Sequence, residues 1–288
     1  MDQQRIQSSA RRRQTQNVVQ AHDSAWFGPR AEPSTLVAFG LRLHGGGAHQ
    51  SKTMMLQELE TLLATGLRTG NELKSAVLDQ NVLGKATRNT RKITFHHLSS
   101  LYGLVDQPAM TKVLIKLWVG DSERHRLLAL LIALARDPLL RATAPLILEG
   151  PLGKPIQRPA FEELLESIYP HRFSEKMLRS LAQNCASSWT QSGHLEGAIK
   201  KIRRRVSPSP DTVALAALLA TVAGHGGPGI LSSLWIKVLD LSSDQALDLL
   251  RRAESLGLAK VRAAGDVTEI ALRQPMATTL QVPELDKF

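Results

Sequence analysis

The chain has 288 residues, and 36 lysines and arginines against 26 aspartates and glutamates give it a formal net charge of +10 at pH 7. Hydrophobic residues make up 43%, enough for a buried core, which excludes a wholly disordered chain. Aromatic residues are only 4%, and a composition rich in Leu and Ala favours helices over strands. The single cysteine, Cys185, excludes an intrachain disulfide and a thiolate zinc cluster; we expect it to be a small buried residue.

No stretch of the sequence is long and apolar enough to cross a membrane, because a spanning helix needs about 20 apolar residues. The most apolar run covers residues 127–135 and is bounded by Arg126 and Arg136. The basic triplet Arg11–Arg13 is not followed by the apolar segment of a signal peptide. We therefore expect a cytoplasmic protein with no membrane contact.

Residues 1–33 are predicted to be a disordered basic arm, because Gln and Ser are frequent and no apolar periodicity develops before Pro33. Such an arm is either a flexible tail that binds phosphates or a terminus without a binding role, and both interpretations remain. The glycines at 45–47 do not form a phosphate-binding loop, since no Gly-Lys-Ser/Thr follows them. They are predicted to be a turn ahead of a helix.

Residues 34–206 are predicted to be a helical domain that begins with a helix-turn-helix-like unit. A first helix is expected from about Ser51, and a second from Thr69, where Thr69 and Glu72 have the spacing of a capping box. A third helix is expected over residues 85–104. Three short helices with a tight turn before the last are typical of helix-turn-helix units.

The predicted third helix has one basic face and one apolar face. At about 100° per residue, the basic arc contains Lys85, Arg88, Arg91, Lys92 and His96. The opposite, core-facing arc contains Ile93, His97, Leu98, Leu101 and Leu104. Phe95 is the exception, because it lies among the basic residues.

Two interpretations of this basic face remain open. A recognition helix presents its N-terminal half to a DNA groove, where Thr87, Arg88 and Asn89 would read bases. An ordinary solvated helix face also carries Lys and Arg. No acidic residue lies between Asp79 and Asp106 to pair with these cations, which favours nucleic-acid binding.

A second basic cluster ends the helical domain and contains Lys200, Lys201, Arg203, Arg204 and Arg205. The nearest acidic residues along the chain are Glu196 and Asp211, so we expect that the five cations are not all ion-paired. The cluster is interpreted either as a phosphate-binding site or as a solvated face.

Residues 207–275 are predicted to be a winged-helix domain, and Ser207–Pro210 at its start is predicted to be the linker that marks the domain boundary. Three helices are expected, one from an N-cap at Asp211 to Val222, one over 230–239 and one over 243–257. Strands over 259–263 and 267–272 flank a glycine-containing turn and predict a β-hairpin. Residues 276–288 are predicted to be a tail.

Two interpretations of this winged helix remain, binding of DNA and binding of a protein, since winged helices bind both. Asp244 and Asp248 at the start of its last helix repel phosphates, whereas Lys260 and Arg262 on the first strand attract them.

The sequence contains no Gly-x-Ser-x-Gly, His-Glu-x-x-His, Rossmann or kinase motif. We therefore expect a non-enzymatic protein with no catalytic residue, cofactor or metal site. His96 and His97 are adjacent rather than one helical turn apart, which does not suit a zinc site.

Several stretches resemble the BrxA family of the BREX bacteriophage-exclusion systems. They are Asn81-Val82-Leu83, Ala86-Thr87, Thr90-Arg91-Lys92, the segment from Ser188 to Gly197 with Lys201, Arg203 and Pro208, then Ser233-Leu234-Trp235, Leu239-Asp240 and Gly257-Leu258. The resemblance covers about residues 36–272. It implies a helical accessory protein of an antiviral gene island that binds double-stranded DNA, with one part similar to NusB-type RNA-binding factors.

The leading hypothesis is therefore a double-stranded-DNA-binding accessory protein of a BREX-type defence system. The first alternative is an interaction scaffold that docks other BREX components through the winged helix. The second is a NusB-like RNA-binding factor, which the small number of aromatic residues disfavours because single-strand readers stack bases on such side chains.

Overall fold

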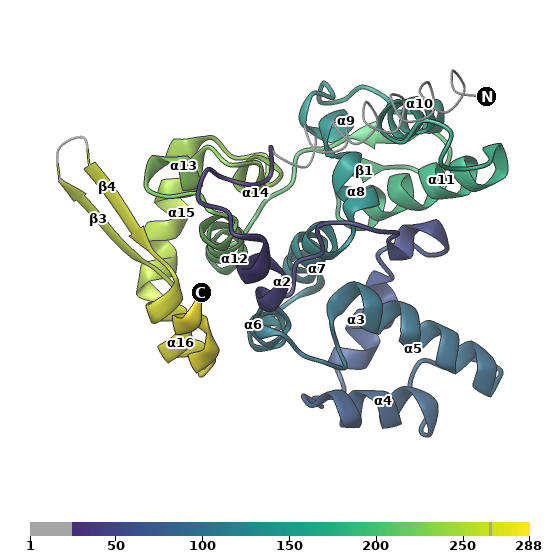
Figure 1. The fold of residues 1–288 in the computed structure, drawn as a ribbon, viewed down its shortest axis with the longest axis horizontal. Coiled ribbons are helices and arrows are strands. Elements are labelled where there is room, and N and C mark those ends of the chain that lie inside the picture. The colour runs from purple at the N-terminus through teal and green to yellow at the C-terminus, as the bar shows by residue number, and fades with distance from the viewer. Residues whose placement is uncertain (1–24, 265–266) are drawn as a thin grey trace, which may run out of the picture.

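The computed structural model describes residues 25–264 and 267–288, and within them the chain is mainly helical. The strands described there form two antiparallel pairs, of which the second is a hairpin near the C-terminus. The predicted fold class, mainly α with a small C-terminal hairpin, is confirmed (Figure 1).

The elements fall into three consecutive groups. The first contains α2 (Pro33–Phe39), the 3-10 helix η1 (Ala48–Gln50), α3 (Leu56–Leu63), α4 (Gly70–Leu78), α5 (Arg88–Tyr102), α6 (Ala109–Leu117) and α7 (Ser122–Arg136). The second contains α8 (Pro138–Ala142), α9 (Ala144–Leu148), α10 (Arg158–Ile168), α11 (Glu175–Gln191), β1 (Leu195–Glu196) and β2 (Ile202–Arg203). The third contains α12 (Pro210–Val222), α13 (Pro228–Leu231), α14 (Leu234–Lys237), α15 (Ser243–Ser255), β3 (Lys260–Ala264), β4 (Val267–Ala271), α16 (Arg273–Leu280) and the 3-10 helix η2 (Pro283–Lys287).

Two helices, α7 and α12, lie side by side in the middle of the molecule (Figure 1). α7 is buried from Leu127 to Arg136, and α12 from Asp211 to Ala220. A helix that is apolar on all sides is stable only when other elements enclose it, and residues 127–135 accordingly form the centre of the core. Among residues 25–264 and 267–288, no helix has the length and apolarity that crossing a bilayer requires.

Helices α3, α4 and α5 form the helix-turn-helix-like part, with α4 packed on α5. The capping box predicted for α4 is confirmed: the Thr69 side chain accepts the N–H of Glu72, and the Glu72 carboxylate accepts the N–H of Thr69 at 2.9 Å. α3 begins at Leu56 rather than near Ser51, because Met55 has a left-handed backbone (φ 52°) that a helix cannot contain.

α5 begins at Arg88, three residues later than predicted. The reason is a local cap, since the Thr87 side chain accepts the N–H of Thr90 at 3.1 Å. Lys85 therefore precedes the helix.

Helices α12 to α15 followed by the β3–β4 hairpin have the element order of a winged helix. α12 begins at Pro210 with Ser209 as its N-cap, so the cap predicted at Asp211 is wrong; proline is favoured at the first helical position. The single helix predicted over 230–239 is two short helices, α13 and α14. Ser242 is the N-cap of α15, with Gln245 completing a capping box.

The chain before α2 lies on this C-terminal module. Trp26 is buried, its carbonyl accepts the indole N–H of Trp235 at 2.9 Å, and the two rings meet edge to face with centroids 4.8 Å apart. The predicted arm is therefore anchored to the fold at Trp26, although Pro29, Arg30 and Glu32 are exposed, and its residues 1–24 lie outside the described residues.

The segment predicted as a tail forms most of α16 together with η2, and Met276 and Leu285 are buried there. Buried side chains before and after the predicted boundary at 207–210 belong to one continuous core. The domain limits themselves stay a prediction.

Candidate nucleic-acid interface

The first half of α5 is exposed to solvent. Arg88, Asn89, Lys92 and His96 are all exposed, and the first turn of the helix contains no acidic residue. Within the described part of the chain, neither Arg88 nor Lys92 has an ion pair or a side-chain hydrogen bond. This half of the helix therefore offers two cations and one amide to a partner, as a recognition helix does.

The buried face of α5 differs from the predicted one and contains Thr94, Phe95, Leu98, Leu101 and Tyr102. Ile93, predicted for the core, is 45% exposed, and Phe95, predicted to lie among the basic residues, is buried. Residues four apart share a helix face, so Arg91 lies on the packed side with Phe95. Its guanidinium donates to the Leu78 carbonyl at 2.9 Å, which removes Arg91 from the exposed basic arc.

Lys85 is also engaged, because its Nζ lies 3.0 Å from Oε1 of Glu58 on α3. The absence of acidic residues between Asp79 and Asp106 therefore does not leave this lysine free, since its partner comes from another helix. The Thr87 hydroxyl is occupied by its cap, so base reading by α5 would fall to Arg88 and Asn89 alone.

Lys52, which was not predicted as a binding residue, is a further cation near α5. Burial, followed by the positive charges of His96 and Lys52, lowers the pKa of His97. Lys52 lies in the segment before α3 and outside any helical periodicity, so only the folded chain reveals that it is near α5.

The basic cluster at 200–205 is largely engaged within the protein. Arg203 is only 3% exposed; its Nη atoms bind the Asp240 carboxylate, with Nη1 3.1 Å from Oδ2, and its Nε donates to the Ile147 carbonyl at 2.9 Å. Asp240 is distant in sequence, which is why the count of neighbouring acidic residues did not find this ion pair.

Two further members of this cluster have partners. The Nε of Arg204 lies 2.6 Å from Oε2 of Glu196, and the Nζ of Lys201 donates to a threonine hydroxyl on α11 at 2.8 Å. Lys200 and Arg205 are exposed and, within the ranges that the structure describes, have no ion pair.

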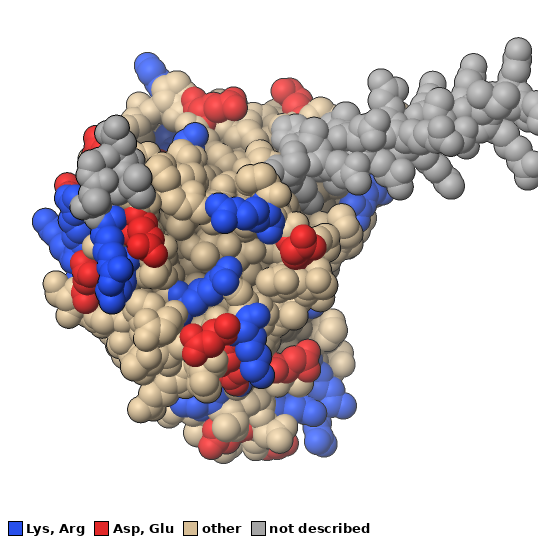
Figure 2. Space-filling model, turned by 60° about the vertical axis from the view of Figure 1, so that its left-hand side comes forward, with Lys and Arg blue, Asp and Glu red and all other residues tan. Residues whose placement is uncertain are grey.

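The hairpin displays Lys260 and Arg262 to solvent on β3. Arg262 lies directly opposite Glu269 on β4, which places a carboxylate beside it. Figure 2 shows Lys and Arg side chains next to Asp and Glu side chains below the grey tip of the hairpin. The electrostatic potential of this face is therefore mixed rather than uniformly positive.

The eleven predicted binding residues do not form one surface. α5 and the hairpin lie at opposite ends of the molecule, and the 200–205 cluster lies with the β1–β2 pair beside α11 (Figure 1). Five of the eleven have partners within the chain. The remaining free cations are Arg88, Lys92, Lys200, Arg205, Lys260 and Arg262.

A buried polar constellation, also missed in the sequence, has the connectivity of a catalytic triad. His49 Nε2 lies 2.8 Å from Ser188 Oγ, and His49 Nδ1 lies 2.7 Å from Asp137 Oδ2. All three side chains have 0% exposure, and Ser188 Oγ also accepts the N–H of Met54 and donates to the Asn184 carbonyl. We interpret this cluster as a structural cross-link between η1, the α7–α8 junction and α11, because a nucleophile needs access to its substrate.

The electrostatics of Asp137 agree with that structural role. Burial raises the pKa of Asp137, but the nearby His49 and the hydrogen bonds from His49 and Leu140 outweigh burial, so the pKa is lowered overall. Gly47 is required beside it, because a Cβ there would lie 1.7 Å from Asp137 Oδ1.

No three His, Cys, Asp or Glu side chains gather as metal ligands would in residues 25–264 and 267–288. Cys185 is buried, and burial raises its pKa well above the ordinary value of a thiol. The chain matches no model of a known protein family, and a search of curated proteins finds no relative.

Proposed function

We propose that this protein binds double-stranded DNA as a non-enzymatic accessory protein of a BREX-type phage-defence system. The observation that carries the DNA-binding part is the exposed N-terminal half of α5, where Arg88 and Lys92 have no counter-charge. The net charge of +10 supports the same function, since a basic protein attracts a polyanion over long range. Membership in a BREX system is supported by the resemblance in the sequence.

In the proposed mechanism, the exposed cations of α5 neutralise backbone phosphates and release counterions. Asn89 is exposed beside them and has the donor and acceptor pair that recognises adenine in the major groove. His96, which is exposed one turn after Lys92, extends the contact along the helix. Most of the affinity would therefore be independent of sequence and would fall steeply with salt.

The test is the affinity of the full chain for a labelled duplex across a salt series. Replacing two phosphate contacts in Arg88→Gln/Lys92→Gln should reduce the slope of log K against log salt by about 2. The control is Lys176→Gln/Arg179→Gln, which removes the same charge from exposed positions on α11. Equal slopes for the α5 variant and the wild-type protein would overturn the proposal.

A protein-docking role of the winged helix is the second candidate, and one observation favours it. Asp244 and Asp248 are exposed at the start of α15, where a DNA-reading helix would meet phosphates. Co-purification with the other proteins of the defence island tests this role: Asp244→Lys/Asp248→Lys should lose the partner without any loss of duplex affinity. Tighter binding of single-stranded RNA than of duplex DNA would instead support the NusB-like alternative.

A further inference from the structure

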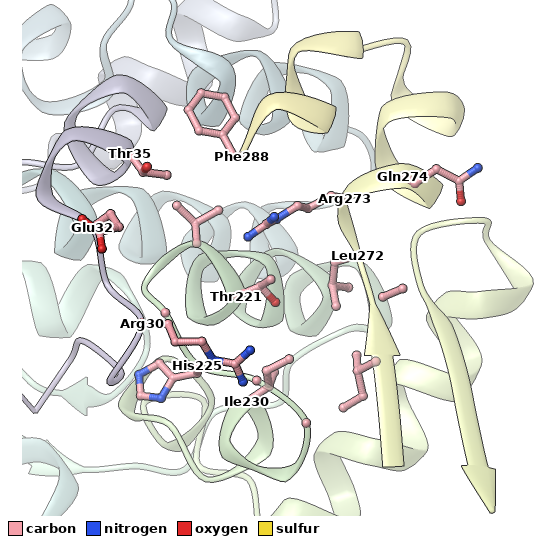
Figure 3. A pocket seen from close by; sticks show the side chains of 16 residues that line it. Arg30, Glu32, Thr35, Thr221, His225, Ile230, Leu272, Arg273, Gln274 and Phe288 are labelled. Atoms are coloured by element: carbon pink, nitrogen blue, oxygen red, sulfur yellow. The ribbon is translucent and has the colours of Figure 1, made fainter. Parts of the chain in front are cut away.

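A pocket of about 540 Å³ lies between the segment before α2 and the C-terminal module (Figure 3). Its walls come from the end of α12, the glycine-rich loop 224–227, β4 and the start of α16, together with Arg30, Glu32 and Phe288. The volume is in the range of pockets that hold small ligands. None of the predicted binding residues lines it.

The position of Arg30 in this pocket is fixed by its backbone neighbours. The N–H of Gly28 donates to the Ala223 carbonyl at 2.7 Å, and the N–H of Arg30 lies 3.4 Å from the Gly224 carbonyl. The guanidinium lies against Gly226, where a Cβ would be 2.4 Å from Nη2. Because Gly226 has no side chain, the guanidinium of Arg30 can occupy this space.

Two cations enter the pocket from different elements. Figure 3 shows the guanidinium groups of Arg30 and Arg273 pointing into the hollow, the first from the glycine-rich loop side and the second from the start of α16. Neither has an ion pair or side-chain hydrogen bond within the described residues, and the Nε of Arg273 is buried without a partner. Burial also lowers the pKa of Arg273. A desolvated cation without a partner is costly, and an anion would remove that cost.

Residues of the lining also have unpaired backbone donors. The N–H groups of Gly226 and Gly227 have no acceptor within the described part of the chain. α16 begins at Arg273 without a side-chain cap, so the N–H groups of Arg273 and Gln274 also lack intrahelical partners. Successive free N–H groups and guanidinium groups together are the donors that bind phosphate oxygens.

The rest of the lining is apolar, with Ile230, Ile270 and Phe288 on the walls. Among the side chains of the lining, Glu32 is the one carboxylate, and it stands against the two arginines. Gln274 points away from the hollow (Figure 3). The pocket therefore combines a small cationic end with apolar walls.

We propose that this pocket binds a small organic phosphate of nucleoside monophosphate size, with the phosphate held between Arg30 and Arg273 and the organic part against Ile230, Ile270 and Phe288. This ligand site is independent of the DNA-binding function proposed for α5.

Calorimetric titration of the full chain tests the proposal with AMP, inorganic phosphate and adenosine. AMP should bind more tightly than inorganic phosphate, because only AMP uses the apolar walls, and adenosine should bind more weakly than AMP. Arg273→Gln and Arg30→Gln should each weaken AMP about 10-fold or more, whereas Glu32→Gln should tighten it. Arg179→Gln, at an exposed position on α11, is the control and should change nothing.

Arg30 is exposed, so Arg30→Gln should fold even if Arg273→Gln does not. The AMP affinity of Arg30→Gln then decides the test. Absence of AMP binding to the wild-type protein, or unchanged AMP affinity in both arginine variants, would overturn the proposal. A loss of duplex affinity in these variants without any AMP binding would also overturn it, because the arginines would then belong to a DNA surface.

Discussion

The imidazole of His49 and the carboxylate of Asp137 form a 2.7 Å contact that is completely shielded from solvent. Oδ2 of Asp137 also accepts the N–H of His49, while Oδ1 accepts the N–H groups of Leu139 and Leu140 at the start of α8. One carboxylate thus holds a loop, a helix junction and, through His49, α11 in place.

Replacing Asp137 with Asn should destabilise the protein strongly. The amide keeps the size of the side chain but removes the charge that faces His49, and breaking a buried pair of this kind costs about 3–5 kcal/mol. Urea unfolding measures the change. Asp121→Asn at the exposed cap of α7 is the comparison, with an expected cost below about 1 kcal/mol. A loss for Asp137→Asn no larger than that would refute the structural role.

Because His194 is buried, the protein should lose stability in acid. Burial lowers its pKa to about 4 from an ordinary value of 6.5, and its Nε2 donates to the Val238 carbonyl at 2.7 Å as a neutral ring. Below pH 6.5 the unfolded chain takes up the proton first, so folding should weaken as the pH falls from 6.5 to about 4. The full loss is on the order of 3 kcal/mol. The free energy of unfolding of His194→Gln should change less over this range than that of the wild-type protein.

Arg203 should matter for stability and not for DNA binding. Arg203→Gln leaves Asp240 without its buried partner, at a cost of about 3–5 kcal/mol, while the salt dependence of duplex binding stays that of the wild-type protein. Arg204→Gln removes only an exposed pair with Glu196 and should cost less than about 1 kcal/mol. A reduced salt slope in Arg203→Gln would return this arginine to the nucleic-acid interface.

Trp26→Ala should test how firmly the segment before α2 is attached. Removing a buried ring that meets Trp235 edge to face costs about 3–5 kcal/mol. Chemical denaturation measures it against Val37→Ala, which is 59% exposed and should stay within about 0.5 kcal/mol of the wild-type protein. Equal stability of the two variants would mean that this segment is dispensable.

The parts of the fold that the sequence predicted well depend on near neighbours in the chain. The capping box of α4 joins Thr69 and Glu72, which are only three residues apart. The central position of residues 127–135 follows from their uninterrupted apolarity. The start of α5 was less accurate, because its cap at Thr87 was not predicted.

The binding site was harder to predict because charge pairing is a tertiary property. Lys85 meets Glu58 across 27 residues, and Arg203 meets Asp240 across 37. The predicted helical wheel placed Ile93 on the core face of α5 and Arg91 on the exposed face. In the structure Phe95 is buried instead of Ile93, and Arg91 lies on the same side of the helix as Phe95. Arg88 and Lys92 have no partner among the described residues, whereas Lys85 and Arg91 do. No feature of the neighbouring sequence distinguishes the two pairs.

The contact between Trp26 and Trp235 spans 209 residues. A ribosome adds roughly 5–20 residues per second, so the first indole is synthesised roughly 10–40 s before its partner. During that interval the ring lacks the partner that it meets edge to face in the finished protein. Closure of this contact therefore belongs to the late stage of biosynthesis.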